Sequence, residues 1–234
     1  MEKLIVSLDL TEKKKVYELV EKLGGLVNFY KVGIIPYLLF GNEILRYLKK
    51  QNKRIFLDLK FFDIPNTVEK AVKIIFDNEI DMFTVHLMAG EKVIKNITEI
   101  KDNVKKDTKI IGVTVLTSFG EEELKFLGIK MKILDLTEKL VEYGYKWGID
   151  GVVCSGEELK TLRPKFKPPF LFVVPGIRVE KSKDDQKRIT TPNEAIKNGA
   201  DFIVVGRPIY ESENPVKIVK KILRLIKNEG KNMD

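Results

Sequence analysis

Three charged residues lie close together in the segment FLDLKFFDIPNT, residues 56–67, within one of the most apolar parts of the chain. They are Asp58, Lys60 and Asp63. A charged side chain costs several kcal/mol to remove from water unless it is paired with an opposite charge. Carboxylate and ammonium groups at this spacing therefore indicate the charged centre of an active site, or else an ion pair that serves only the fold.

Two glycine-containing segments near the C-terminus have the composition of a phosphate site. VVPGIR, residues 173–178, and VVGRPI, residues 204–209, each end a predicted strand with a glycine, whose backbone amide can approach an anion closely. Arg207 would add a charge-assisted hydrogen bond to phosphate oxygens. The polar stretch between the two segments, residues 179–192, is too long for an ordinary connection. We interpret it as a lid that closes over a ligand; a surface loop with turn glycines is the alternative.

The segments that carry these residues alternate between strand-like and helical patterns. Almost continuously apolar runs are typical of parallel strands that are covered on both faces. Helical periodicity places apolar residues on one face of residues 12–23, 66–76 and 215–226. The predicted strands are residues 4–8, 29–33, 54–59, 83–87, 110–116, 151–154, 170–174 and 202–205.

Strands that alternate with helices in this way predict an α/β fold of the (β/α)8 barrel (TIM barrel) class, which typically takes about 250 residues. With 234 residues and 44% hydrophobic residues, the chain is long enough to bury one core, so we expect a single domain over residues 1–234. An open doubly wound sheet is the alternative, but no GxGxxG motif follows the first predicted strand.

A barrel of this class has its active site at the carboxyl ends of the strands, so polar residues should collect there. Asp58 and Lys60 are two positions apart, and their side chains therefore point to the same side of the third strand, which can be the barrel axis. The ends of the other strands supply Asp9, Lys31, His86, Thr117, Ser118, Pro175, Gly176, Gly206 and Arg207.

Composition restricts the partners and the compartment. The formal net charge of +8 is spread over amphipathic segments without an arginine–aromatic cluster, so we expect solvated lysine faces and no nucleic-acid partner. The single cysteine, Cys154, excludes an intrachain disulfide and an all-cysteine zinc site. No signal peptide is recognisable and no uncharged apolar run approaches ~18 residues, so we expect a cytoplasmic protein without membrane contact.

A set of motifs extends over nearly the whole chain in a definite order. They are SLD at 7–9, YKVG at 30–33, DLKFFDIPNT at 58–67, LTS at 116–118, PGIR at 175–178, DQKRITTP at 185–192 and GADFIVVGRPI at 199–209. Together they resemble the orotidine 5′-phosphate decarboxylase family, particularly its bacterial form. The D-x-K-x-x-D motif alone is also similar to sugar-phosphate decarboxylases of the same superfamily, whereas the full set is specific.

The resemblance implies an array of alternating charges formed by Lys31, Asp58, Lys60 and Asp63. Each buried charge then has an opposite neighbour, so the array offsets its own desolvation and titrates as a coupled set. In the family, the residues corresponding to Asp63 and Thr67 reach into the site of the neighbouring subunit. This implies a homodimer with shared active sites.

The reaction implied is decarboxylation of orotidine 5′-phosphate to UMP and CO2, the last step of de novo UMP biosynthesis, without a cofactor or metal. Lys60 would stabilise the carbanion on the ring carbon and then protonate it, with Asp58 against the departing carboxylate. The implied substrate contacts are Asp9 and Lys31 at the ribose, Thr67, Thr117 and Ser118, Pro175, and Arg178, Gln186, Gly206 and Arg207, the last four at the phosphate.

Three other functions are weighed against this one. Magnesium-dependent sugar-phosphate decarboxylases or aldolases of the superfamily place an acidic metal ligand where this chain has Lys31, which would repel Mg²⁺. A ribulose-phosphate epimerase needs a metal site built largely from histidines, and the chain has only His86. A non-catalytic phosphate- or nucleic-acid-binding barrel is the third. His86 itself is interpreted as a supporting residue, and Cys154 and Trp147 as packing residues.

Overall fold

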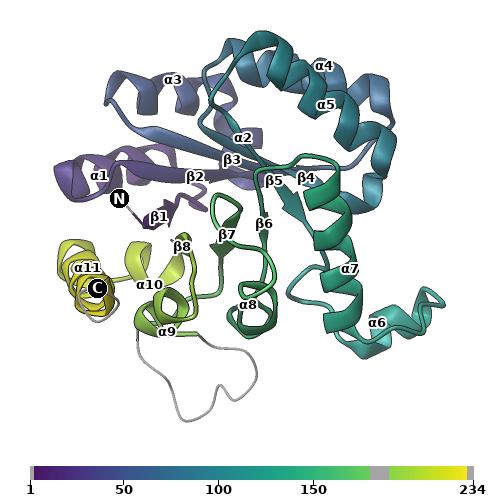
Figure 1. Ribbon diagram of the computed structural model, residues 1–234. Helices are drawn as coiled ribbons and strands as arrows, with labels where there is room; N and C mark the ends of the chain where they lie inside the picture. Colours follow the sequence, from purple (N-terminus) through teal and green to yellow (C-terminus); the bar gives the residue numbers. More distant parts are fainter. Residues whose placement is uncertain (1–2, 180–189, 231–234) are drawn as a thin grey trace.

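Eight parallel strands form a closed barrel in the computed structural model, which describes residues 3–179 and 190–230 (Figure 1). Each strand pairs with the next one, and the last strand returns to pair with the first. The predicted (β/α)8 barrel is therefore confirmed, and the open sheet is excluded. The strands are β1 (Leu4–Ser7), β2 (Phe29–Gly33), β3 (Arg54–Phe61), β4 (Met82–His86), β5 (Lys109–Val113), β6 (Gly151–Val153), β7 (Leu171–Val174) and β8 (Phe202–Val205).

Helices alternate with the strands. The α-helices are α1 (Lys13–Leu23), α2 (Ile34–Phe40), α3 (Asn42–Lys50), α4 (Pro65–Asp77), α5 (Glu91–Val104), α6 (Glu121–Phe126), α7 (Ile133–Lys146), α8 (Gly156–Leu162), α9 (Pro192–Lys197), α10 (Arg207–Tyr210) and α11 (Pro215–Gly230); the 3-10 helices are η1 (Gly24–Leu26) and η2 (Leu87–Ala89). The three helices predicted from periodicity are confirmed as α1, α4 and α11. The predicted strand 110–116 was too long at its end, because residues 114–116 already belong to the loop that leaves β5.

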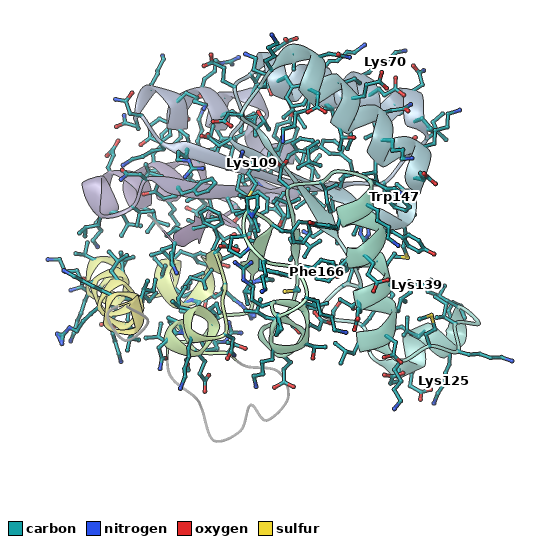
Figure 2. All side chains as sticks on the ribbon, in the orientation of Figure 1. Lys70, Lys109, Lys125, Lys139, Trp147 and Phe166 are labelled. Atoms are coloured by element: carbon teal, nitrogen blue, oxygen red, sulfur yellow. The ribbon has the colours of Figure 1, made fainter. Side chains whose placement is uncertain are left out.

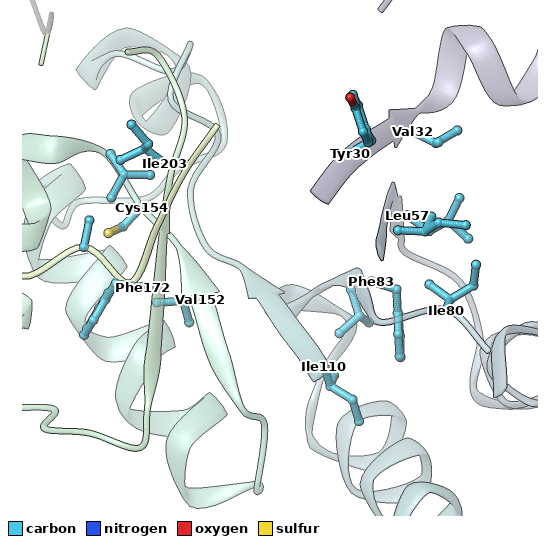
Figure 3. Close-up of a cluster of buried hydrophobic side chains, with 14 of the residues drawn as sticks. Tyr30, Val32, Leu57, Ile80, Phe83, Ile110, Val152, Cys154, Phe172 and Ile203 are labelled. Carbon is cyan, nitrogen blue, oxygen red and sulfur yellow. The ribbon is translucent and has the colours of Figure 1, made fainter. Parts of the chain in front are cut away.

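The core consists of two apolar layers, one inside the barrel and one between the strands and the helices. Phe29, Phe56 and Met82 belong to the inner layer. Tyr30, Leu57 and Phe83 belong to the outer layer, part of which is shown in Figure 3. Because successive residues of a strand face opposite sides, both layers draw on every strand, and the strand sequences are apolar almost without interruption.

Most of the positive charge lies on solvated surfaces. Figure 2 shows Lys70, Lys125 and Lys139 on α4, α6 and α7, and all three are exposed. Lys125 pairs with Glu122 one turn earlier on the same helix. Within the described part of the chain, no helix combines the length and apolar character needed to cross a bilayer.

Three aspartates clamp the strands at the end of the barrel opposite the carboxyl ends. Asp81, Asp150 and Asp201 each stand directly before an even-numbered strand, and each accepts the backbone N–H of a residue in the preceding odd-numbered strand. The donors are Ile55, Ile110 and Phe172 at 2.9, 2.7 and 2.8 Å. Each carboxylate also pairs with a cation, namely Lys49 and Arg54, Lys101, and Arg163 in turn. The same arrangement thus links β3 to β4, β5 to β6 and β7 to β8.

Replacing Asp150 by alanine should lower the free energy of unfolding by about 2–3 kcal/mol, because the Ile110 N–H and Lys101 both lose a charged acceptor. Lys101 Nζ lies 2.6 and 2.7 Å from the two carboxylate oxygens, and the two side chains are only 15% and 19% exposed. Urea unfolding of both proteins measures the difference. Asp107→Ala is the control, since Asp107 is fully exposed and should give no measurable change; equal losses for both variants would contradict the clamp.

Candidate active site

A cavity of about 260 Å³ opens at the carboxyl ends of the strands. Five of its lining residues were predicted for the site: the polar residues Lys31, Asp58, Lys60 and Thr117, and Pro175. The remaining walls are apolar, formed by Phe56, Val113, Val115, Leu116, Val153, Val173 and Val204. A few polar groups placed against apolar walls are typical of a site for a small molecule.

Four alternating charges run across the mouth of the barrel. Lys31 Nζ lies 3.1 Å from Asp9 Oδ1 and 3.5 Å from Asp58 Oδ2. Lys60 Nζ donates to both oxygens of Asp58 at 2.9 Å. We call Asp9, Lys31, Asp58 and Lys60 the mouth array. Three members of the predicted array are thus brought together, and Asp9 extends the alternation beyond Lys31.

The mouth array keeps its central carboxylate charged. Burial alone would raise the pKa of Asp58, but the ammonium groups of Lys31 and Lys60, with hydrogen bonds from Lys60 and Thr84, outweigh burial and lower that pKa below its ordinary value. Asp58 is therefore a carboxylate at neutral pH. The interactions that lower its pKa stabilise the fold above the ordinary pKa of an aspartate, and this contribution is lost as the pH falls through the lowered value.

The backbone of β3 leaves the regular strand conformation at Lys60. Its φ is +51°, and the pairing of β3 with β4 shifts register between Leu57 and Phe61. The prediction that Asp58 and Lys60 lie on one side of the strand is confirmed by their contact. That prediction assumed regular strand geometry, and this assumption is wrong at Lys60. The residue occupies the left-handed region, which is uncommon for a residue with a side chain.

Gly33 leaves room for the first ion pair of the mouth array. A Cβ atom at this position would lie 2.7 Å from Asp9 Oδ1 and 2.9 Å from Lys31 Nζ. No side chain fits there unless the ion pair moves. Gly33 belongs to the YKVG motif but was not among the predicted site residues, because a close approach of side chains from two strands cannot be derived from spacing.

Two buried hydroxyl groups beside the mouth array were also missed. Ser7 Oγ donates to Asp9 Oδ2 at 2.6 Å, and Thr84 Oγ1 donates to Asp58 Oδ1 at 3.0 Å. Ser7 stands two residues before Asp9, and Thr84 stands two residues before His86. The period of two in a strand was the available signal, since it places each hydroxyl on the barrel side below a polar strand end.

Asp63 and Thr67 are exposed in the single chain. Asp63 Oδ1 accepts the backbone N–H of Ile64 at 2.7 Å, in the loop that leads into α4. The chain therefore does not bring the fourth member of the predicted array to the other three. Their expected placement in the site of a neighbouring subunit stays a prediction.

The predicted phosphate residues lie on neighbouring loops, because β7 and β8 are paired. Gly206 and the exposed Arg207 lie where β8 passes into α10. The half-buried Arg178 follows β7, and its backbone N–H donates to the Thr190 carbonyl at 3.1 Å. Gln186 and most of the predicted lid lie outside the described residues. At the fifth strand, Thr117 lines the cavity, whereas Ser118 is exposed and is not part of the lining.

His86 and Cys154 are both buried. Burial, with a smaller effect of Lys60, lowers the pKa of His86, so its imidazole is neutral at pH 7, and its Nδ1 has no hydrogen-bond partner among the described residues. Burial raises the pKa of the Cys154 thiol well above its ordinary value, and the residue belongs to the outer core layer. The prediction that Cys154 is a packing residue is confirmed. Trp147 likewise packs, with its ring stacked on Tyr143.

Comparison with known proteins gives one consistent family. Residues 2–222 match the model of the Orotidine 5′-phosphate decarboxylase / HUMPS family. The chain is 40% identical over 231 residues to orotidine 5′-phosphate decarboxylase of Lawsonia intracellularis, covering 97% of this chain and 100% of that protein, and 40% identical over 227 residues to that of Carboxydothermus hydrogenoformans, covering 95% of each. The crystal structure of orotidine 5′-phosphate decarboxylase from Lactobacillus acidophilus matches with a TM-score of 0.84 and 32% identity, covering 97% and 99% of the two chains.

Gly33→Ala tests whether the mouth array needs the space above Gly33. The added Cβ should displace Asp9 or Lys31 and lower the free energy of unfolding by about 1–3 kcal/mol. Thermal and urea unfolding measure the change. Gly25→Ala is the matched control, because a Cβ there meets nothing within 4 Å. Unfolding curves for Gly33→Ala that coincide with the control would show that the ion pair moves aside without loss.

Proposed function

Because this chain belongs to the orotidine 5′-phosphate decarboxylase / HUMPS family, we propose how its barrel mouth carries out the reaction of that family, as one catalytic domain over residues 1–234. It is a carboxy-lyase that converts orotidine 5′-phosphate to UMP and CO2 in pyrimidine biosynthesis. The observation that carries the mechanism is the alternation of charges in the mouth array, at one wall of an otherwise apolar cavity.

Lys60 is the proposed proton donor. The bond between the pyrimidine carbon and the carboxylate breaks, CO2 leaves, and the electron pair stays on the ring carbon. The Lys60 ammonium stabilises this developing carbanion and then transfers a proton to it, which forms UMP and leaves a neutral amine that solvent reprotonates. Two contacts at 2.9 Å with Asp58 fix the ammonium, and the 35% exposure of the Lys60 side chain is consistent with its place in the cavity lining.

Asp58 holds the Lys60 ammonium, and Lys31 distinguishes this site from that of a metal-dependent enzyme. Asp58 would lie against the departing carboxylate, and Lys31 with Asp9 would bind the ribose hydroxyls. The Lys31 ammonium lies between the carboxylates of Asp9 and Asp58, where a divalent cation would have to bind. A positive side chain in that position disfavours the magnesium-dependent sugar-phosphate reaction.

The segments that follow β5, β7 and β8 are proposed to bind the pyrimidine edge and the phosphate of the substrate. Thr117, which lines the cavity, is proposed at the pyrimidine edge together with the exposed Ser118 that follows it, and Pro175 at the cavity wall. The phosphate is assigned to Arg178, Gln186, Gly206 and Arg207. Binding energy from the phosphate can support chemistry at the distant ring carbon, provided that it is realised in the transition state.

A homodimer would bring Asp63 and Thr67 into the site. The segments that follow β2, β3 and β4 are neighbours at the barrel mouth: helix α2, the loop before α4, and η2. They expose large apolar side chains: Ile34, Ile35, Leu38, Leu39, Phe62, Ile64 and Met88. Apolar side chains grouped on one surface are typical of a protein contact. Asp63, in the loop after β3, and Thr67, in the first turn of α4, belong to one of these segments. A second copy that covers this surface could place its own Asp63 beside Lys60.

Purified protein should decarboxylate orotidine 5′-phosphate in the presence of EDTA, and Lys60→Ala should reduce kcat by at least about 100-fold because the preorganised charge and the proton donor are both removed. The change in pyrimidine ultraviolet absorbance follows turnover. Lys125→Ala, on the exposed face of α6, is the control and should retain full activity. An inactive, folded wild-type protein, or activity that requires Mg²⁺, would overturn the proposed function.

Mixing two inactive variants tests the shared site. Lys60→Ala and Asp63→Ala, refolded together, should regain about a quarter of wild-type activity, since half of the dimers are mixed and each mixed dimer has one intact site of two. If Asp63 acts within its own chain, no activity returns. Lys60→Ala refolded with Asp58→Ala is the control, because both residues belong to one chain's site, and this mixture should stay inactive.

A further inference from the structure

Thr84 connects the two central members of the mouth array through one hydroxyl group. It lies on β4 and is completely buried. Its Oγ1 accepts the backbone N–H of Lys60 at 2.9 Å and donates to Asp58 Oδ1 at 3.0 Å. The contacts cross from β4 to β3 where the register between those strands shifts. One atom therefore contacts the side chain of Asp58 and the backbone of Lys60 at the same time.

The backbone of Lys60 needs such a contact. A non-glycine residue in the left-handed region is strained and persists only where its surroundings hold it. The irregular pairing of β3 with β4 interrupts the ladder around this residue, and the Thr84 hydroxyl satisfies its N–H. The Thr84 side chain is fully buried and has one rotatable bond between heavy atoms, so it has little freedom to break its hydrogen bond with the Lys60 N–H.

The carboxylate of Asp58 is limited in the same way. Lys31 contacts Oδ2, Lys60 contacts both oxygens, and Thr84 contacts Oδ1. Because the hydroxyl already accepts from Lys60 N–H, its single proton is directed to Asp58. The rotation of the carboxylate is thereby fixed, and with it the direction in which Asp58 holds the Lys60 ammonium.

We propose that Thr84 is a positioning residue for the decarboxylation, which locks the Lys60 bulge and the Asp58 carboxylate together so that the Lys60 ammonium is held at one place over the reacting carbon. The inference rests on the proposed role of Lys60. Thr84 itself does not line the cavity and does not touch the substrate in this scheme. Its effect on the reaction passes through Asp58 and Lys60.

Thr84→Val keeps the size and β-branch of the side chain and removes only the hydroxyl. We expect kcat to fall by about 10- to 100-fold, the loss of one hydrogen bond to a charged group, while KM changes by less than about threefold. The acid limb of the kcat/KM profile should move to higher pH, since a hydrogen bond that lowers the pKa of Asp58 is gone. Thr84→Ser, which restores the hydroxyl, should recover most of the activity and the original profile.

Thr108→Val is the matched structural control. Thr108 is also buried, and its hydroxyl donates to the Ile80 carbonyl at 2.7 Å, away from the cavity lining. It should lose stability without a change in kcat or in the acid limb. Wild-type kcat and pH profile in folded Thr84→Val, or no rescue by serine, would overturn the proposal. If Thr84→Val does not fold, Thr84→Ala carries the same comparison at lower temperature.

Carbon-13 NMR titration of the Asp58 carboxyl group separates this inference from the proposed function. A higher pKa of Asp58 in Thr84→Val than in Thr108→Val supports the lock even if the wild-type protein proves inactive on orotidine 5′-phosphate. An unchanged Asp58 titration overturns it even if the wild-type enzyme is active. An inactive wild-type protein counts against the proposed function and leaves this measurement decisive for Thr84.

Discussion

The ion pairing across the barrel mouth constrains the residues around it. Lys31 is shared between two carboxylates, and Asp58 between two ammonium groups, so removing Lys31 takes the ion-pair partner from Asp9, and removing Asp58 takes it from Lys60. The neighbouring positions are occupied accordingly. Gly33 has no side chain because the first ion pair takes its space, and Ser7 and Thr84 supply hydroxyl groups that orient the two carboxylates. Geometry at the mouth is therefore set by polar contacts rather than by apolar packing.

The opposite end of the barrel uses charge differently. There Asp81, Asp150 and Asp201 each hold a backbone N–H of the neighbouring strand and a cation from outside the barrel. These carboxylates are paired with groups of the fold itself, and none of them lines the cavity at the barrel mouth. Because the strands are fixed at this end, the backbone at the other end can tolerate a left-handed residue such as Lys60 without loss of the barrel.

Sequence patterns predicted the barrel for two reasons. Strands that are buried on both faces, β1 to β8, have almost continuously apolar sequences, and the amphipathic helices α1, α4 and α11 have a clear helical period. They also predicted that Asp58 and Lys60 meet. They could not predict the bulge at Lys60, the hydroxyl bridge of Thr84 or the steric need for Gly33, because each depends on atoms from two strands. Asp63 was predicted to belong to the array, yet in the single chain it accepts the backbone N–H of Ile64, and its place in the site of a second copy stays a prediction.

The charge balance of the mouth array bears on how an anionic substrate binds. Two carboxylates and two ammonium groups give this array no formal net charge, and the lowered pKa of Asp58 keeps the balance at neutral pH. The array therefore offers little net attraction to a substrate that carries both a carboxylate and a phosphate. In the proposed mechanism, attraction comes from Arg178 and Arg207 at the phosphate end. The mouth array can then favour the transition state, in which charge moves from the departing carboxylate to the ring carbon beside Lys60, over the bound substrate.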